Sequence, residues 1–458
     1  MEVSITSPPA PAGDWRAESR LMWQQSLPNI GLNVTRMMMT FIDFVMVAAL
    51  GKAAIAAISP ATLFVLILVA VGMAITNTVT TFASQAFGRG ELREASAYAW
   101  QSIYVGAATM IACYPLMLCV EPIFRWFGHE PEVFRMEVEY CRICIWSMGP
   151  AVAATGLNSF FVGIQRPRVG LISVMAALCV NALGNYLLIY GKFGFPALGI
   201  AGAAIATVIG WCVRMGLLLC IFLREPLATK FETRRTWRIS GPRLWNLLRV
   251  GSPTSVQWIL DIAAWFLFQT ILIAGFGTSA LAAANVVIQC MHVSFMPAIG
   301  IGMTICSLVG HAIGEGRPAL AVRRTAIGCA MISLYMGPVG VAFVVFREFL
   351  IGLFSSDVVV IEVGALMLIW AGVFQLFDGI GIAYCMALRG AGDTAYPAAA
   401  IFVLAWAVFL GGGWAATRWL PAWGFHGPWA ACTVYVVLFG LVMWWRFRGG
   451  RWRGIKIA

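Results

Sequence analysis

Charged residues are scarce in this chain, and their scarcity excludes most soluble folds. Asp, Glu, Lys and Arg make up 11% of the 458 residues, whereas soluble domains contain about 25%. Hydrophobic residues make up 60%, and the mean hydropathy is +0.84. Apolar runs of about 20 residues, the length that crosses a bilayer as a helix, recur along the chain. The sequence therefore predicts an all-α polytopic membrane protein and not a barrel of short alternating strands.

Motifs of soluble enzymes are also missing. The chain has no phosphate-binding loop, no dinucleotide fingerprint, no GxSxG elbow and no His-rich metal spacing. Its twelve cysteines are scattered singly, apart from Cys141 and Cys144, so we expect packing and not disulfides or zinc. We expect no enzymatic activity, no cofactor and no structural metal. Because no nucleotide-binding domain is present, an ion gradient is the expected energy source, unless a separate subunit supplies the energy.

Twelve hydrophobic stretches predict twelve membrane spans. Several exceed the length that a bilayer requires and contain Pro or Gly, which predicts tilted or kinked helices. The polar, Pro-rich residues 1–21 lack the apolar core of a signal peptide and predict a cytosolic tail. The stretches cover approximately residues 22–48, 53–83, 96–120, 138–162, 169–190, 198–222, 249–274, 280–308, 326–346, 360–388, 395–416 and 427–446.

The basic residues predict the orientation of these spans. The N-terminal tail, the even-numbered turns with Arg249, and the C-terminal tail (residues 448–458) with Arg446 carry 22 of the 31 Lys and Arg residues, and the opposite side carries six. The positive-inside rule then places both termini in the cytoplasm, in a cytoplasmic (inner) membrane. The net charge of +11 is explained by topology, so no nucleic-acid partner is expected. The basic segment 223–248 is interpreted as a cytosolic linker that lies against anionic lipid.

The two halves of the chain are related by an internal repeat. The run from Ala49 to Ser59 aligns with Gly275 to Asn285 at an offset of 226 residues, and PALGIAG from Pro196 aligns with PAWGFHG from Pro421. Six spans on each side of the linker predict two lobes of the same topology, residues 22–222 and 249–447, around a central cleft. Opposite Asp43, however, the repeat places Gln269 and no acid.

Three carboxylates lie deep in the predicted spans: Asp43 in the first, Asp261 in the seventh and Asp378 in the tenth. A charge at this depth costs about 2.5–3.5 kcal/mol, so it usually faces a cavity and binds ions or substrate. The competing interpretation is a structural carboxylate neutralised by hydroxyls or by an arginine, for which Arg36, Arg142 and Arg214 are the candidates.

Two amides and several large side chains complete the candidate sites. Asn181 and Asn185 share a face of the fifth predicted span and can reach Asp43 if the helices are neighbours; the alternative is an interhelical hydrogen bond. A subset of the Met and aromatic residues is expected to line the cleft and contact small amphiphilic or cationic substrates. The candidates for this wall are Met39, Trp258, Trp265, Phe374 and Tyr384.

Four motifs resemble the multidrug and toxic compound extrusion (MATE) transporters, and the likeness extends from about Leu21 to Phe447. They are IDFVMVAALGKAAIAAI from Ile42, SQAFGRGE from Ser84, YGKFGFPALGIAGAAIAT from Tyr190 and FQLFDGIGIAYCMALRGAGDT from Phe374. The last is the most specific, because an intramembrane Asp precedes an LRGxGD turn that comprises Arg389, Gly390, Gly392 and Asp393. The resemblance implies a V-shaped molecule that exchanges cytoplasmic compounds for external H⁺ or Na⁺.

The resemblance also implies roles for individual residues. Asp43 matches the acid of the first lobe's cation site, with Asn181, Asn185 and Thr207 as oxygen partners, and Asp378 matches the tenth-helix acid. Asp261 stands where the NorM-like branch usually has Glu, and Asn185 stands where the DinF-like branch has Asp, so the set of acids looks NorM-like.

The leading hypothesis is a monomeric, cation-coupled efflux antiporter. Two others compete with it: a flippase of a lipid-linked or anionic metabolite from the same superfamily, and a structural membrane protein that does not transport.

Overall fold

The computed structural model describes residues 15–455 and 457, which form helices joined by turns and contain no strand. Helix α1 begins at Trp15, so residues 15–21 of the predicted tail are helical, and residues 1–14 lie outside the described part. The helices of the first half are α1 (Trp15–Ala48), α2 (Lys52–Asn77), α3 (Val79–Arg89), α4 (Leu92–Cys113), α5 (Leu116–Phe127), α6 (Pro131–Cys144), α7 (Met148–Gly163), α8 (Pro167–Tyr190) and α9 (Ile200–Leu223).

The second half repeats this order after a short linker helix. Two of its long helices contain π-helical segments, which are written η2 and η4. The elements are α10 (Leu227–Lys230), α11 (Gly241–Leu267) with η2 (Phe268–Ile273), α12 (Thr278–Gly314), α13 (Pro318–Val345), α14 (Arg347–Gly352), α15 (Val358–Ala391), α16 (Ala395–Val403) with η4 (Leu404–Leu410), α17 (Gly411–Trp419) and α18 (His426–Arg448).

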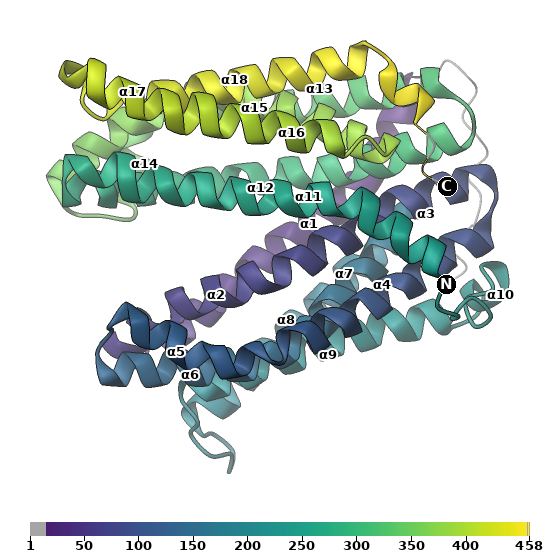
Figure 1. Cartoon of the computed structure of the whole chain (residues 1–458), viewed down its shortest axis with the longest axis horizontal. Helices are drawn as coiled ribbons and strands as arrows, with labels where there is room; N and C mark the ends of the chain where they lie inside the picture. The colour runs from purple at the N-terminus through teal and green to yellow at the C-terminus, as the bar shows by residue number, and fades with distance from the viewer. Residues whose placement is uncertain (1–14, 456, 458) are drawn as a thin grey trace.

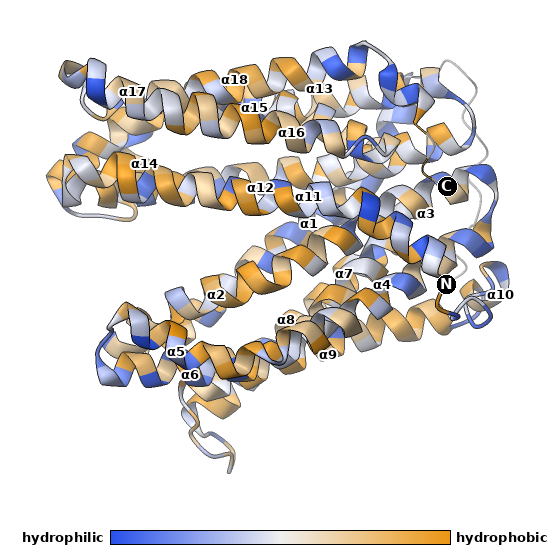
Figure 2. Cartoon of the chain, in the orientation of Figure 1, coloured by the Kyte–Doolittle hydropathy of each residue, from blue (hydrophilic) through white to orange (hydrophobic). Residues whose placement is uncertain are grey.

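Within the described residues, ten helices are long and apolar enough to cross a membrane, or eleven if the bent pair α4 and α5 forms one span. The predicted span at 138–162 is absent from this count. There the 3₁₀ turn η1 (Ile145–Ser147) separates α6 from α7, and neither helix reaches 18 residues. Hydrophobic residues cover most of the length of the helices, and hydrophilic residues gather at their ends (Figure 2).

Two helical bundles diverge from a common base (Figure 1). The first has a core built from α2–α9, and the second has a core built from α11–α18. We call the base, where α3, α10 and both ends of the described chain lie, the closed end, and the opposite tips, with α5, α14 and α17, the open end. The bundles touch through α1 against α12 and through α2 against α11, which are equivalent pairs in the repeat.

The repeat is visible in the backbone of two turns. Gly51 precedes α2 with φ 111°, and Gly277 precedes α12 with φ 99°. Only glycine adopts such angles readily, because a Cβ atom would clash there. The two residues are 226 positions apart, so the repeat preserves the turn that begins each second long helix.

At the closed end, equivalent residues of the two halves meet each other. A Cβ atom added to Gly88 of α3 would lie 3.0 Å from the Cα of Gly314 of α12, and one added to Gly314 would lie 3.0 Å from the Cα of Gly88. Thr81 donates a hydrogen bond to the carbonyl of Arg389 (2.9 Å), and Ser307 donates one to the carbonyl of Val162 (2.6 Å). Small residues therefore bring the backbones of the two bundles into direct contact.

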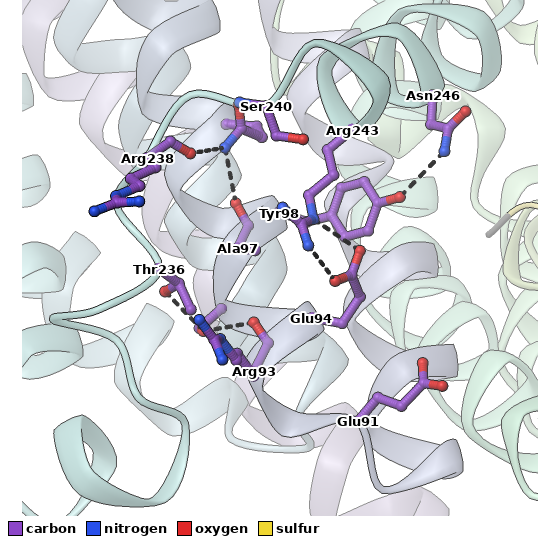
Figure 3. Close-up of polar contacts among 12 residues, drawn as sticks. Glu91, Arg93, Glu94, Ala97, Tyr98, Thr236, Arg238, Ser240, Arg243 and Asn246 are labelled. Carbon is purple, nitrogen blue, oxygen red and sulfur yellow. Dashed lines mark hydrogen bonds and ion pairs between the residues drawn. The ribbon is translucent and has the colours of Figure 1, made fainter.

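The basic linker is attached to the first bundle and is not a free loop. Ser96 and Trp100 of α4 donate hydrogen bonds to linker carbonyls at Phe231 and Thr233, both at 2.7 Å. Figure 3 shows the next stretch, where Arg243 makes two hydrogen bonds to Glu94, at 2.9 and 2.8 Å. These contacts hold the start of α11 against α4.

The predicted C-terminal tail also packs at the closed end. Arg451–Gly454 forms the 3₁₀ turn η6, and Trp452 is 1% exposed and stacks on Phe447 with ring centroids 4.9 Å apart. Residues 456 and 458 lie outside the described part.

Candidate functional site

The structure brings Asp43 and Asn185 together in the first bundle. Asp43 is half-buried on α1, and the Asn185 side-chain amide donates a hydrogen bond of 2.5 Å to its Oδ1 atom. Asn181 lies one turn along α8, close enough to act on the same carboxylate. The hydroxyl of Tyr190 also donates to the carbonyl of Met46 (2.9 Å), which fastens α8 to α1 beyond the site.

The two asparagines retain unused hydrogen-bonding capacity. Both are 0% exposed, and neither amide atom of Asn181 nor the Oδ1 of Asn185 has a hydrogen-bond partner among the described residues. Buried polar groups are seldom left unpaired, because the loss of their hydration is not compensated. A carboxylate beside two amide oxygens is the type of donor set that suits a hard cation or a proton.

Thr207 is not joined to this set. Its hydroxyl donates to the carbonyl of Ala203 on its own helix, at 3.0 Å. Met39 does lie beside the site: a Cβ atom on Gly210 of α9 would lie 3.5 Å from the Met39 Cε and 3.3 Å from the Asn181 Cβ. The absence of a side chain at Gly210 thus lets α1, α8 and α9 approach one another.

The second bundle places Asp261 of α11 and Asp378 of α15 close enough for their charges to interact. Both are half-buried, and no hydrogen bond joins either carboxylate to the described residues. Tyr435 and Cys432 of α18 lie close to both acids. On the closed-end side, Arg389 is close to Asp261 and donates to the side chain of Gln257 (3.0 Å).

The predicted turn motif is part of the contact between the bundles. Arg389 and Gly390 lie inside α15, which extends to Ala391, and the carbonyl of Gly390 accepts a hydrogen bond from Gln85 of α3 (3.0 Å). Gly392 ends the helix with φ 89°, and the buried Asp393 accepts a hydrogen bond from Arg446 (2.8 Å). The motif was predicted to form a cytosolic turn, and Gly392 and Asp393 do lie in the connection between α15 and α16. The motif also docks this end of α15 onto α3 and α18.

The expected cleft residues occupy different surroundings. Phe374 is 1% exposed in the core of the second bundle, so it does not line an open cleft in this structure. Tyr384 packs against Phe447 near the closed end. Trp265 contacts Phe409, and Trp258 is half-buried on the same helix, α11.

None of the three candidate arginines neutralises an intramembrane acid. Arg142 pairs with Glu121 (3.0 Å), and Arg36 and Arg214 pair with no described acid. A buried ion pair joins the two halves: Arg324 of α13 donates a hydrogen bond to Glu18 of α1 at 2.9 Å. Nothing in the sequence pattern predicts this pair. Finding that pair requires knowledge of which helices are neighbours.

Comparisons with known proteins agree with this architecture. The chain matches the MatE family at residues 28–187 and again at 253–410, so the family pattern occurs once in each half. It is 29% identical over 441 residues to a probable multidrug resistance protein NorM of Rhizobium meliloti, covering 94% of each chain. It is 27% identical to the protein of the same name from Thermotoga maritima, covering 93% of this chain and 91% of the relative.

Solved structures share the fold at lower identity. The bent form of the Vibrio cholerae MATE transporter VcmN superposes with a TM-score of 0.85 at 19% identity, covering 94% of this chain and 97% of that one. The eukaryotic MATE transporter AtDTX14 superposes with a TM-score of 0.83 at 17% identity, covering 95% and 97%. Two matched segments that together span more than half of the sequence, one in each bundle, show that this chain belongs to the MATE family of transporters and is NorM-like.

Proposed function

We propose that this protein exports amphiphilic, cationic compounds from the cytoplasm in exchange for external H⁺ or Na⁺. The observation that carries the proposal is the Asp43 site, where a half-buried carboxylate lies beside buried amides with unpaired oxygens. The proposal agrees with the multidrug resistance proteins that the chain resembles.

In this proposal the chain is a monomer of twelve spans in two six-helix lobes, residues 22–222 and 249–447, joined by the linker 223–248. The two spans that complete the twelve are the third and fourth in chain order, formed by the bent pair α4–α5 and the broken pair α6–α7. Both termini and the closed end face the cytoplasm, so the structure corresponds to an outward-facing state of a protein of the inner membrane. The V-shaped arrangement then presents the gap between the bundles to the outside.

Exchange follows from competition at the acids. A carboxylate in a medium of low dielectric binds a cation or a proton readily. Two neighbouring carboxylates also bind one readily, because the bound positive charge relieves the repulsion between them. When the ion binds at Asp43, or at Asp261 and Asp378, the site is neutral and does not attract a cationic compound. When the ion leaves, the negative charge attracts the compound again, so the two species alternate.

Transport in proteoliposomes tests the proposal. The double variant Asp43→Asn and Asp378→Asn is expected to lose ethidium export, whereas Asp357→Asn is expected to retain it, because Asp357 caps α15 outside the candidate sites. Dissipating the pH gradient and the Na⁺ gradient separately identifies the coupling ion. Undiminished export by the double variant would refute the site assignment, and a failure of the unmodified protein to export any compound would favour the structural alternative.

A second candidate function is the movement of an anionic or lipid-linked compound. It is favoured by Arg36 and Arg214, which lie in the first bundle and have no acidic partner in the part of the chain that the structure describes. One structure of the same fold, from Pyrococcus furiosus, is described as a superfamily transporter whose binding pocket has reverse polarity, suggesting a different function; it has a TM-score of 0.87 at 17% identity. Export of an anionic dye in place of ethidium would support this candidate.

A further inference from the structure

Two arginines in the first bundle have no acidic partner among the described residues. Arg214 lies on the buried face of α9 and is 2% exposed, and Arg36 is half-buried on α1. The guanidinium groups are close enough to interact electrostatically. Among residues 15–455, no carboxylate forms an ion pair with either of them.

The unpaired atoms of Arg214 form a defined recognition edge. Its Nε and Nη2 atoms are buried and have no hydrogen-bond partner in the described part of the chain. In Arg243 the same two atoms bind the two carboxylate oxygens of Glu94, at 2.9 and 2.8 Å. The geometry that Arg243 uses for a carboxylate is therefore also presented by Arg214, without a protein group to bind.

The surroundings fix this edge in place. The Arg214 guanidinium lies over the ring of Trp211, 5.3 Å from its centroid, so one face of its plane is covered. One turn along α9, a Cβ atom added to Gly210 would contact Met39 and Asn181. Arg36 precedes Asp43 by two helical turns, about 10 Å, so Arg36, with Arg214 close to it, lies on the closed-end side of the acid. Helix α8 packs against both α1 and α9 here.

Two like charges without counter-charges are unfavourable in a medium of low dielectric. The Asp43 carboxylate is two turns away and is bonded to Asn185, so it does not compensate them in this structure. A guanidinium fork recognises planar carboxylates and other small anions through charge-assisted hydrogen bonds.

We propose that Arg36 and Arg214 form a binding site for a monovalent anion, with the Nε–Nη2 edge of Arg214 as its principal donor. The anion is either a free halide or the carboxylate group of a compound that the protein transports. The site does not depend on the cation exchange proposed above, since it is defined by binding at equilibrium.

Iodide is the probe, because it quenches indole fluorescence on contact and Trp211 covers Arg214. Purified full-length protein is titrated with sodium iodide against sodium gluconate at constant ionic strength. We expect a saturable component of quenching that is absent from Trp211→Phe and is at least tenfold weaker in affinity in Arg36→Gln and Arg214→Gln. Arg418→Gln, which removes an exposed charge at the open end, should behave as the unmodified protein.

A second measurement guards against misfolded variants. Chloride should raise the melting temperature of the unmodified protein, because a ligand that binds only the folded state stabilises it. The increase should vanish in Arg36→Gln, whose half-buried side chain is the easier one to replace. The proposal would be overturned if iodide quenching and chloride stabilisation were equal in Arg36→Gln and the unmodified protein. It would also be overturned if the unmodified protein showed neither effect.

Competition distinguishes the two sources of the anion, and each result supports the site. If benzoate displaces iodide and is carried into proteoliposomes, the anion is the carboxylate of a transported compound. If chloride displaces iodide and benzoate does not, the anion is a free halide. Because iodide binding is measured without a gradient, a failure of the unmodified protein to export ethidium would refute the proposed function and leave the anion site standing.

Discussion

At the scale of single residues, the candidate coupling site depends on one short hydrogen bond. Asn185 is 0% exposed, and its amide orients the Asp43 carboxylate at 2.5 Å. A hydrogen bond to a charged group contributes about 1.5–3 kcal/mol. The orientation of the acid, and with it the affinity for the ion, is therefore expected to depend on this amide.

Replacing Asn185 with Leu is expected to lower the affinity for the coupling ion by about tenfold or more, since 1.4 kcal/mol corresponds to a factor of ten. The measurement is the concentration of Na⁺ or H⁺ that gives half-maximal export in proteoliposomes. Asn246→Ala is the control, because Asn246 makes only a 3.4 Å hydrogen bond to Tyr98 at the closed end. An unchanged ion dependence in Asn185→Leu would show that the amide plays no part in coupling.

At the scale of elements, the closest approach of the bundles depends on glycine. Gly88 on α3 and Gly314 on α12 allow the two backbones to touch, and any side chain there would meet the facing backbone. Because backbone cannot yield as a flexible side chain does, the helices themselves would have to separate. The closed end is thus sensitive to the addition of a single methyl group.

We expect Gly314→Val to separate α12 from α3 and shift the population toward a state that is open at this end. Overpacking a tight contact typically costs about 1–3 kcal/mol. Spin labels at Arg93 of α4 and Ala319 of α13, both exposed, report the distance between the bundles. Gly216→Ala is the control, because nothing lies within 4 Å of that added Cβ; a distance distribution unaltered by Gly314→Val would contradict the assignment.

At the scale of the whole molecule, the two halves are joined by more than the linker. Helix α1 packs on α12 and α2 packs on α11. The buried pair of Glu18 and Arg324 adds a contact between α1 and α13, and breaking such a pair costs about 3–5 kcal/mol. Linker residues that bind α4 strengthen the attachment of α11 to the first bundle.

Two halves expressed as separate chains, divided within the linker, are therefore expected to associate in the membrane. An affinity tag on the first half should recover the second half in roughly equal amount. The variant Glu18→Gln, which removes the carboxylate charge that pairs with Arg324, should lower the recovery. Halves that never copurify would show that the continuous chain is needed to hold the bundles together.

The membrane class and the repeat could be predicted from the sequence, because both depend on local composition and on alignment of the chain with itself. The pairing of Asp43 with Asn185 could be predicted only on the condition that their two helices are neighbours. The span predicted at 138–162 is two shorter helices in the structure, because the 3₁₀ turn that begins at Ile145 interrupts it. The burial of Phe374 and the missing partners of Arg214 depend on tertiary packing, which residue spacing does not encode.

The meeting of Gly88 with Gly314 has a consequence for the ancestry of the chain. When a residue touches its own duplicate across an axis, the contact is isologous, as in a homodimer with twofold symmetry. The closed end therefore retains the interface expected of an ancestral pair of identical six-helix subunits, from before their fusion. Any substitution at this contact had to suit both copies at first. Asp43 and its equivalent Gln269, which lie on α1 and η2 and not at the meeting of α3 with α12, have diverged into unlike residues.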